Sequence, residues 1–140
     1  MEVEKSFLSE TAIWKTVSEF VDPTGQIFIG EGESNVIVNG KSIANRSWLT
    51  VLGTKLENNY SITQISQNRY QFIAHKPHSG IETGFMDIDR NIVYTKFVIE
   101  DSELNGFETI ARKGDTCDIS GALYDGDKLI NTWTAKMIKI

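Results

Sequence analysis

Short runs of β-branched and aromatic residues follow one another from Gly25 to the end of the chain, and clusters of Gly, Asn and Asp separate them roughly every 8–12 residues. This spacing is typical of an all-β sandwich or barrel. The runs predict about nine strands, near residues 25–38, 41–52, 59–66, 69–75, 80–88, 92–99, 106–113, 116–124 and 128–139.

The connections between these runs are short, which predicts antiparallel neighbours, since a parallel crossover needs about a dozen residues or more. Asn39-Gly40 is the clearest turn and predicts a type I′ hairpin with two positive φ values. An open meander of this many strands would leave two edges with unpaired backbone groups. We therefore expect an up-and-down meander closed into a barrel of about 8–10 strands, with a flat sandwich as the alternative.

Before the strands, apolar residues recur at helical spacing, which predicts one amphipathic N-terminal α-helix over about 9–21. Ser9 is a suitable N-cap, and Asp22-Pro23 ends the element because the residue before a proline is disfavoured in the helical region. Such a helix is expected to cover one end of the barrel. The apolar residues are Ile13, Val17, Phe20 and Val21.

The composition of the 140-residue chain favours one domain over 1–140 with a core of its own. A single cysteine, Cys117, excludes an intramolecular disulfide and a multi-cysteine zinc site, and favours a cytoplasmic location. A net charge of −5 with scattered basic residues argues against nucleic acid and anionic membranes as partners. The apolar runs are too short to span a membrane.

Strand alternation assigns polar and aromatic residues to the inner face of the barrel. Asn131 shares a face with Trp133 and Ala135, and Thr109 is grouped with Phe107. Buried polar groups are unfavourable unless paired, so this mixture predicts the lining of a small-molecule cavity. The alternative is that they lie at strand ends or bond one another. The predicted binding residues on this face are Tyr60, Gln64, Thr95, Phe97, Thr109, Asn131 and Trp133.

For the strand over 41–52, the pattern does not decide which face points inward, because both faces carry apolar residues. One face includes Asn45 and the other includes Arg46. If Trp48 points inward, Arg46 accompanies it and is a candidate partner for a ligand carboxylate. If it does not, Arg46 belongs to the solvated surface.

The remaining motifs favour structural interpretations, and we predict no metal and no cofactor. His75 and His78 flank a turn without further ligands, and burial of Cys117 on an apolar face predicts a raised thiol pKa. Glycines inside predicted strands suggest tight barrel corners or space left for a neighbouring side chain or a ligand. These glycines are Gly30, Gly32, Gly84 and Gly121.

An N-terminal helix followed by an uninterrupted meander of eight to ten short strands in about 140 residues resembles the calycin group, which includes lipocalins and fatty-acid-binding proteins. The resemblance covers the chain in architecture and includes no signature motif. It implies that the barrel binds a small apolar or amphipathic molecule as a carrier or sensor. Two alternatives remain open: a barrel isomerase or hydrolase that uses His75, Asp87 or Arg46, and a filled barrel that serves as an interaction module.

Overall fold

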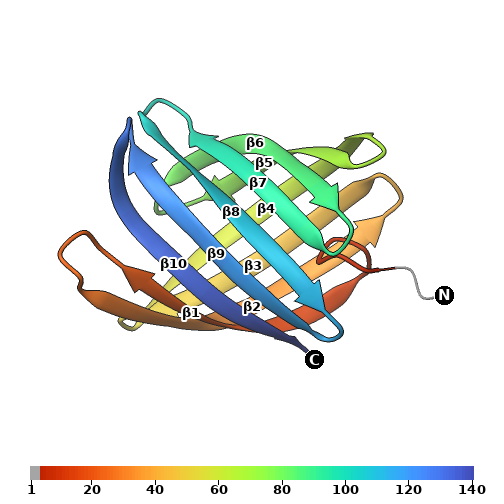
Figure 1. Ribbon diagram of the computed structural model, residues 1–140, viewed down its shortest axis with the longest axis horizontal. Coiled ribbons are helices and arrows are strands. Elements are labelled where there is room, and N and C mark those ends of the chain that lie inside the picture. Colours follow the sequence, from red (N-terminus) through yellow and green to blue (C-terminus); the bar gives the residue numbers. More distant parts are fainter. Residues whose placement is uncertain (1–3) are drawn as a thin grey trace.

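The computed structural model describes residues 4–140 as ten antiparallel strands closed into one barrel (Figure 1). Each strand pairs with its neighbours in sequence, and β1 closes the barrel against β10. The strands are β1 (Ala12–Val21), β2 (Ile27–Asn39), β3 (Ser42–Val51), β4 (Thr54–Ser66), β5 (Arg69–Lys76), β6 (Gly80–Asp89), β7 (Ile92–Ile99), β8 (Leu104–Lys113), β9 (Thr116–Asp125) and β10 (Lys128–Lys139).

The predicted meander and its closure are confirmed, and the strands predicted after Gly25 correspond to β2–β10. The turn at Asn39-Gly40 differs in detail from the type I′ prediction. Asn39 stays in β2 and pairs with Ser42, so the connection consists of Gly40 and Lys41. Only Gly40 has a positive φ there, of 61°.

The predicted N-terminal helix is wrong, because residues 12–21 form β1, and the part of the chain that the structure describes contains no helix. Ile13 and Val17 lie exposed on the outer face of β1 while Phe20 lines the interior, so the apparent helical spacing combines residues from both faces. The inner positions Thr16 and Ser18 are polar and hide the period of two. β1 also supplies the backbone partners that β2 and β10 would otherwise lack.

One end of the barrel, here called the covered end, is closed by the segment 4–11, which runs across it as coil and turn (Figure 1). Phe7 and Leu8 are each only 3% exposed, and the Phe7 ring packs against Trp14 with 5.8 Å between ring centroids. Ser9 is not a helix cap: its Oγ accepts a 2.7 Å hydrogen bond from the Ser6 amide within a tight turn.

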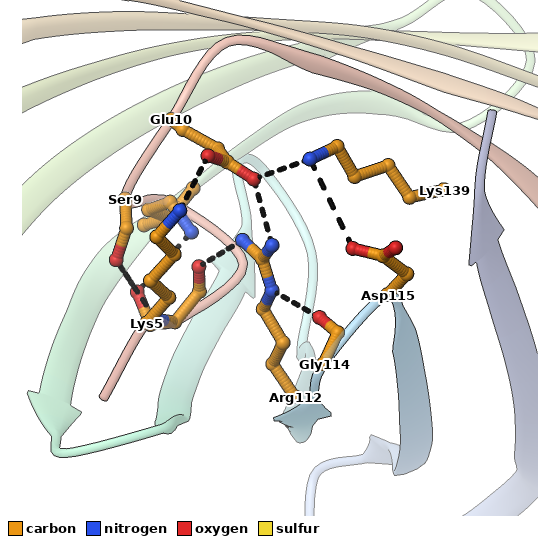
Figure 2. Close-up of polar contacts among 9 residues, drawn as sticks. Lys5, Ser9, Glu10, Arg112, Gly114, Asp115 and Lys139 are labelled. Atoms are coloured by element: carbon orange, nitrogen blue, oxygen red, sulfur yellow. Dashed lines mark hydrogen bonds and ion pairs between the residues drawn. The ribbon is translucent and has the colours of Figure 1, made fainter. Parts of the chain in front are cut away.

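Arg112 ties this segment to the barrel from below (Figure 2). Its buried guanidinium donates to the Glu10 carboxylate at 2.7 Å and to the Ser6 carbonyl at 3.2 Å. A third bond, at 2.8 Å, goes to the Gly114 carbonyl in the β8–β9 turn. Three directed bonds to a planar cation fix the path of the segment over the barrel.

Glu10 is the centre of the same network, and Figure 2 shows it facing two barrel cations and one from the segment. Lys139 approaches its carboxylate at 2.8 Å and Lys5 at 3.1 Å. Hydrogen bonds from Lys139, Arg112 and Lys5 lower the pKa of Glu10 from 4.5 to about 2. The carboxylate therefore stays charged at any ordinary pH and holds the cover in place.

The hydrophobic core is concentrated toward the covered end of the barrel. The strand register places its members within a few residues of the β2–β3, β4–β5, β6–β7 and β8–β9 turns, which lie at this end. Burial raises the pKa of the Cys117 thiol to about 12, as expected for a thiol in an apolar core. The core includes Trp14, Val36, Ile43, Ile62, Phe72, Met86, Val93, Ile110, Cys117 and Met137.

Candidate functional site

The barrel encloses a cavity of about 510 Å³, and several core residues form part of its wall, among them Ile62, Met86, Val93, Ile110 and Met137. Phe7 and Leu8 bound it toward the covered end, and at the opposite end its wall reaches the exposed turn residues His78 and Ser79. The cavity therefore communicates with solvent at that end, here called the mouth. Its apolar wall includes Phe20, Phe28, Leu49, Val51, Leu56, Ile99 and Leu123. Its polar wall includes Thr16, Asn45, Ser47, Asn58, Tyr60, Lys76, Glu82, Thr95, Glu108 and Asn131.

Lys76 and Glu82 form an ion pair inside the barrel, with 2.7 Å between Lys76 Nζ and Glu82 Oε2. Lys76 also lies 5.6 Å from the ring centroid of Tyr60, within the range of a cation–π contact. Burial opposes the charge on Lys76, but the Glu82 carboxylate outweighs the effect of burial, and the pKa of Lys76 is raised. Burial also raises the pKa of Tyr60 to about 12, so its hydroxyl remains protonated.

Glu108 is a second carboxylate on the cavity wall. Its Oε2 accepts a 2.8 Å hydrogen bond from Trp133 Nε1, the one hydrogen bond to this carboxylate among residues 4–140. Burial raises the pKa of Glu108, while the Trp133 hydrogen bond and the charge of Lys76 act in the opposite direction. Glu108 therefore lacks the directly paired cation that Glu82 has.

Gly121 makes the contact between Glu108 and Trp133 possible. It pairs with Glu108 across β8–β9 and with Trp133 across β9–β10. A Cβ at Gly121 would collide with the Trp133 indole ring. The prediction that a strand glycine leaves space for a neighbouring side chain is thus confirmed here, and at Gly84 a Cβ would instead collide with the Lys96 backbone.

Three oxygens on the cavity wall are buried without a hydrogen-bond partner within the described chain. Two are amide oxygens, Asn45 Oδ1 and Asn131 Oδ1, and the third is the hydroxyl Thr16 Oγ1. A buried polar atom without a partner is unfavourable by about 1–3 kcal/mol. The interior therefore offers hydrogen-bonding capacity that the protein does not use itself.

The structure brings together on the cavity wall most of the residues that were predicted to face inward. They are Tyr60, Thr95, Phe97, Asn131 and Trp133.

Two predicted positions, Thr109 and Arg46, are wrong, and Gln64 is on the predicted face but beyond the cavity. Thr109 faces outward and shares a 3.0 Å hydrogen bond with the Ser120 hydroxyl, because the inner face of β8 carries Glu108 and the outer face Phe107, which is 45% exposed. Gln64 shares the inner face with Tyr60 and Ile62, but it lies at the end of β4 outside the cavity and donates to the Gln67 carbonyl at 3.0 Å. Arg46 is exposed, since the inner face of β3 is the one that carries Asn45.

The ionisable residues Lys76, Glu82 and Glu108 were missed by the sequence reasoning, which assigns charged residues to solvent. Strict alternation would have placed two of them inside, since Lys76 is two residues from the buried Ala74 and Glu108 is two residues from the buried Ile110. Of the residues considered for a barrel enzyme, His75 and Asp87 are exposed outside the cavity. Asp87 pairs with Arg69 at 3.5 Å.

No protein-family model and no curated protein matches the chain. Among solved structures, the fold is similar to Rv2717c from M. tuberculosis, with a TM-score of 0.70 and 13% identity over 93% of this chain and 92% of that one. It is also similar to the S-type phycobiliprotein lyase CPES from Guillardia theta, with a TM-score of 0.68 and 6% identity over 93% and 88%. Likeness at this level of identity concerns the fold alone, and it supports the predicted closed barrel architecture.

Residues 4–140 contain no group of three or more His, Cys, Asp or Glu side chains arranged to hold a metal ion. The same residues include no helix long and apolar enough to cross a membrane.

Proposed function

We propose that this protein binds a small amphipathic molecule inside the barrel, as a carrier or sensor. The observation that carries the proposal is the cavity of about 510 Å³, in which an apolar wall surrounds a few inward-pointing polar groups. Ligand pockets have volumes of about 300–1,000 Å³ and this same combination of apolar surface and sparse polar anchors. The candidate ligand-binding residues are Tyr60, Thr95, Phe97, Asn131 and Trp133 from the sequence, joined by Asn45, Lys76, Glu82 and Glu108.

The buried polar groups support binding rather than a purely structural role. A barrel stabilised only by packing would gain nothing from Glu108 or from the unpartnered oxygen of Asn45. Lys76 is held as an ion pair by Glu82 instead of being presented as a free amine, which favours non-covalent binding. One similar structure is a phycobiliprotein lyase, and this makes bilins one ligand class to include in a test.

Native mass spectrometry of the purified protein tests the proposal directly, since a co-purified ligand would add its mass to that of the chain. A thermal-shift screen with fatty acids, retinoids, haem, flavins and bilins complements it. A ligand at one hundred times its dissociation constant stabilises the fold by about 2.7 kcal/mol. We expect at least one class to raise the melting temperature.

Two matched variants separate cavity binding from surface binding. Ala135 is 7% exposed on the cavity wall, and Ala135→Phe fills part of the cavity. Ala111 is partly exposed on the outer face of β8, and Ala111→Phe adds the same bulk outside. We expect the first variant to lose the ligand-induced shift and the second to keep it. A shift that survives in Ala135→Phe, or the lack of any ligand across the screen, would contradict binding in the barrel.

A further inference from the structure

We propose that the ligand carries a cationic N–H donor group, such as a protonated amine, which Glu108 receives, while the apolar remainder fills the barrel. This inference rests on the proposed function and specifies the ligand class of the same site. Three separate observations support it: the balance of charge inside the cavity, the orphan acceptors on its wall, and the charge of its mouth.

Of the three carboxylates on the cavity wall, Glu57 is exposed and lies 3.8 Å from Lys55, and Glu82 pairs with Lys76, which leaves Glu108 uncompensated. Lys76 is the only lysine or arginine on the cavity wall within the described residues, and it is engaged by Glu82 at 2.7 Å. Glu108 has only the neutral indole N–H of Trp133 as a direct partner. A ligand cation beside Glu108 would supply the missing partner, and hydrogen bonds between ionised groups are roughly twice as strong as neutral ones.

The unpartnered oxygens on the wall accept hydrogen bonds, and an ammonium group only donates them. Asn45 is 8% exposed and its Oδ1 faces the cavity without a donor. Asn131 lies two residues from Trp133 on the same face of β10, so its orphan Oδ1 is on the Glu108 side of the cavity. An ammonium or amidinium head group has several N–H donors and matches such a set.

The turns around the mouth are acidic. The connections 22–26, 52–53, 77–79, 100–103 and 126–127 contain no lysine or arginine. At the covered end, by contrast, the short turns include Lys41 and Arg90. Lys55 and Lys128 lie just beyond these connections, but the five acidic residues outnumber them. An excess of charge of one sign at a mouth raises the local concentration and the association rate of ligands of the opposite sign. The acidic residues in the mouth connections are Asp22, Glu100, Asp101, Glu103 and Asp127.

An anionic head group fits this environment poorly. It would pass the acidic mouth and then lie near Glu108 and Glu82, and the only cation on the described cavity wall would have to leave Glu82 to receive it. Because like charges at close range are unfavourable and a buried charge needs a partner, a carboxylate ligand is disfavoured at both steps.

Cation binding is also expected to depend on pH through Glu108. The side chains that face it are Trp133 from β10, Thr95 from β7, and the charged pair of Lys76 and Glu82 from β5 and β6. Burial raises the pKa of Glu108 above 4.5, so the carboxylate forms only as the pH rises through that raised pKa. The affinity for a cation should increase over the same interval.

Calorimetric titration with decylamine, decanol and decanoate tests the inference, because the three probes share one alkyl chain and differ in head group. We expect decylamine to bind at least tenfold more tightly than decanol, and decanoate to bind most weakly. Glu108→Gln should reduce the decylamine affinity at least tenfold and leave decanol binding unchanged. Glu31→Gln, which neutralises an exposed carboxylate on the outer face of β2, should change neither.

The outcomes separate this inference from the proposed function. If decanol or decanoate binds as tightly as decylamine, the cationic head group is wrong while ligand binding in the barrel stands. If none of the three probes binds, both fail. The pH dependence of decylamine affinity in the unmodified protein is a second measurement, and it does not require the Glu108→Gln variant to fold. An affinity that stays constant or falls as the pH rises from 4 to 8 would overturn the role of Glu108.

Discussion

Trp133 and Glu108 meet inside the barrel across Gly121, the residue that pairs with both of them, and Trp133 Nε1 donates a 2.8 Å hydrogen bond to Glu108 Oε2. The two side chains belong to β10 and β8, which are separated by β9. They reach one another because the intervening residue has no side chain. This arrangement holds a carboxylate in a fixed position on the wall of an otherwise mainly apolar cavity.

Gly121→Ala should displace the Trp133 indole and break its hydrogen bond to Glu108, because the added Cβ collides with the ring. Overpacking of this kind destabilises a protein by about 1–3 kcal/mol. Urea denaturation followed by tryptophan fluorescence measures both the stability and the environment of the ring. Asp125→Asn, at an exposed position of the same strand, is the control and should stay within about ±0.5 kcal/mol. A Gly121→Ala protein as stable as the control would show that the ring moves without penalty.

Glu108→Gln should stabilise the protein at high pH. The folded pKa of Glu108 is raised above its ordinary value of 4.5, so the folded state of the unmodified protein holds this proton more tightly than the unfolded chain does. That stability is present below pH 4.5 and is lost as the pH rises through the folded pKa. Glutamine carries no charge and keeps an oxygen for the Trp133 N–H.

Denaturation curves for Glu108→Gln and the unmodified protein at pH 4, 6 and 8 measure this effect. We expect the variant to be the more stable protein at pH 8, by more than the roughly 0.5 kcal/mol typical of surface substitutions, and the difference to shrink at pH 4. Glu31→Gln should show no such trend, since Glu31 is exposed on the outer face of β2. A Glu108→Gln protein that is less stable at every pH would mean that the carboxylate stabilises the fold rather than serving a ligand.

The strands from β2 to β10 could be predicted because their signals are local. Turn residues end each strand, and side-chain alternation acts between adjacent residues. The errors inside these strands have the same origin: on β8, choosing Phe107 as the inner residue moved Thr109 inward and Glu108 outward, since a slip of one residue exchanges the two faces of a strand.

β1 and the burial of charged side chains in the cavity could not be predicted from hydrophobic periodicity. The pairing of β1 with β10 joins the two ends of the chain, and Trp14 finds its partner Lys139 only when the barrel closes. Thr16 and Ser18 replace apolar residues at inner positions because they face a cavity, so a reading based on hydrophobic periodicity fails there. Lys76 and Glu82 are buried because they neutralise one another, a condition that depends on the pairing of β5 with β6.

Acid should weaken the attachment of the N-terminal segment. The folded pKa of Glu10 is about 2, below its ordinary value of 4.5, because Lys139, Arg112 and Lys5 donate to the carboxylate. The stability from this lowered pKa is present above pH 4.5 and is lost as the pH falls toward 2. We expect Glu10→Gln to be less stable than the unmodified protein at pH 6, by about 1–2 kcal/mol after solvent screening, and the two proteins to converge near pH 2.

Melting curves from pH 6 to pH 2 provide the test for Glu10. Glu4→Gln, which changes an exposed carboxylate in the same segment, is the matched control. A constant difference between Glu10→Gln and the unmodified protein over the whole pH range would show that the loss comes from packing and not from the charge.

Phe7→Ala should open the covered end of the barrel. Phe7 is 3% exposed, packs against Trp14 at 5.8 Å between ring centroids, and forms part of the cavity wall. Truncating a buried phenylalanine removes about 3–5 kcal/mol of stability, and here it also connects the cavity to solvent at a second end. Because the segment can rearrange, we expect a loss of stability of about 3 kcal/mol in urea denaturation. We also expect faster exchange of any cavity ligand in stopped-flow measurements.

Phe107→Ala is the control, since Phe107 lies on the outer face of β8 and is 45% exposed. It should cause a clearly smaller loss of stability and leave ligand exchange unchanged. Phe7→Ala could also lower the stability and leave the exchange rate at its original value. Ligands would then enter and leave only through the mouth, because Leu8 and the Arg112 network keep the covered end closed.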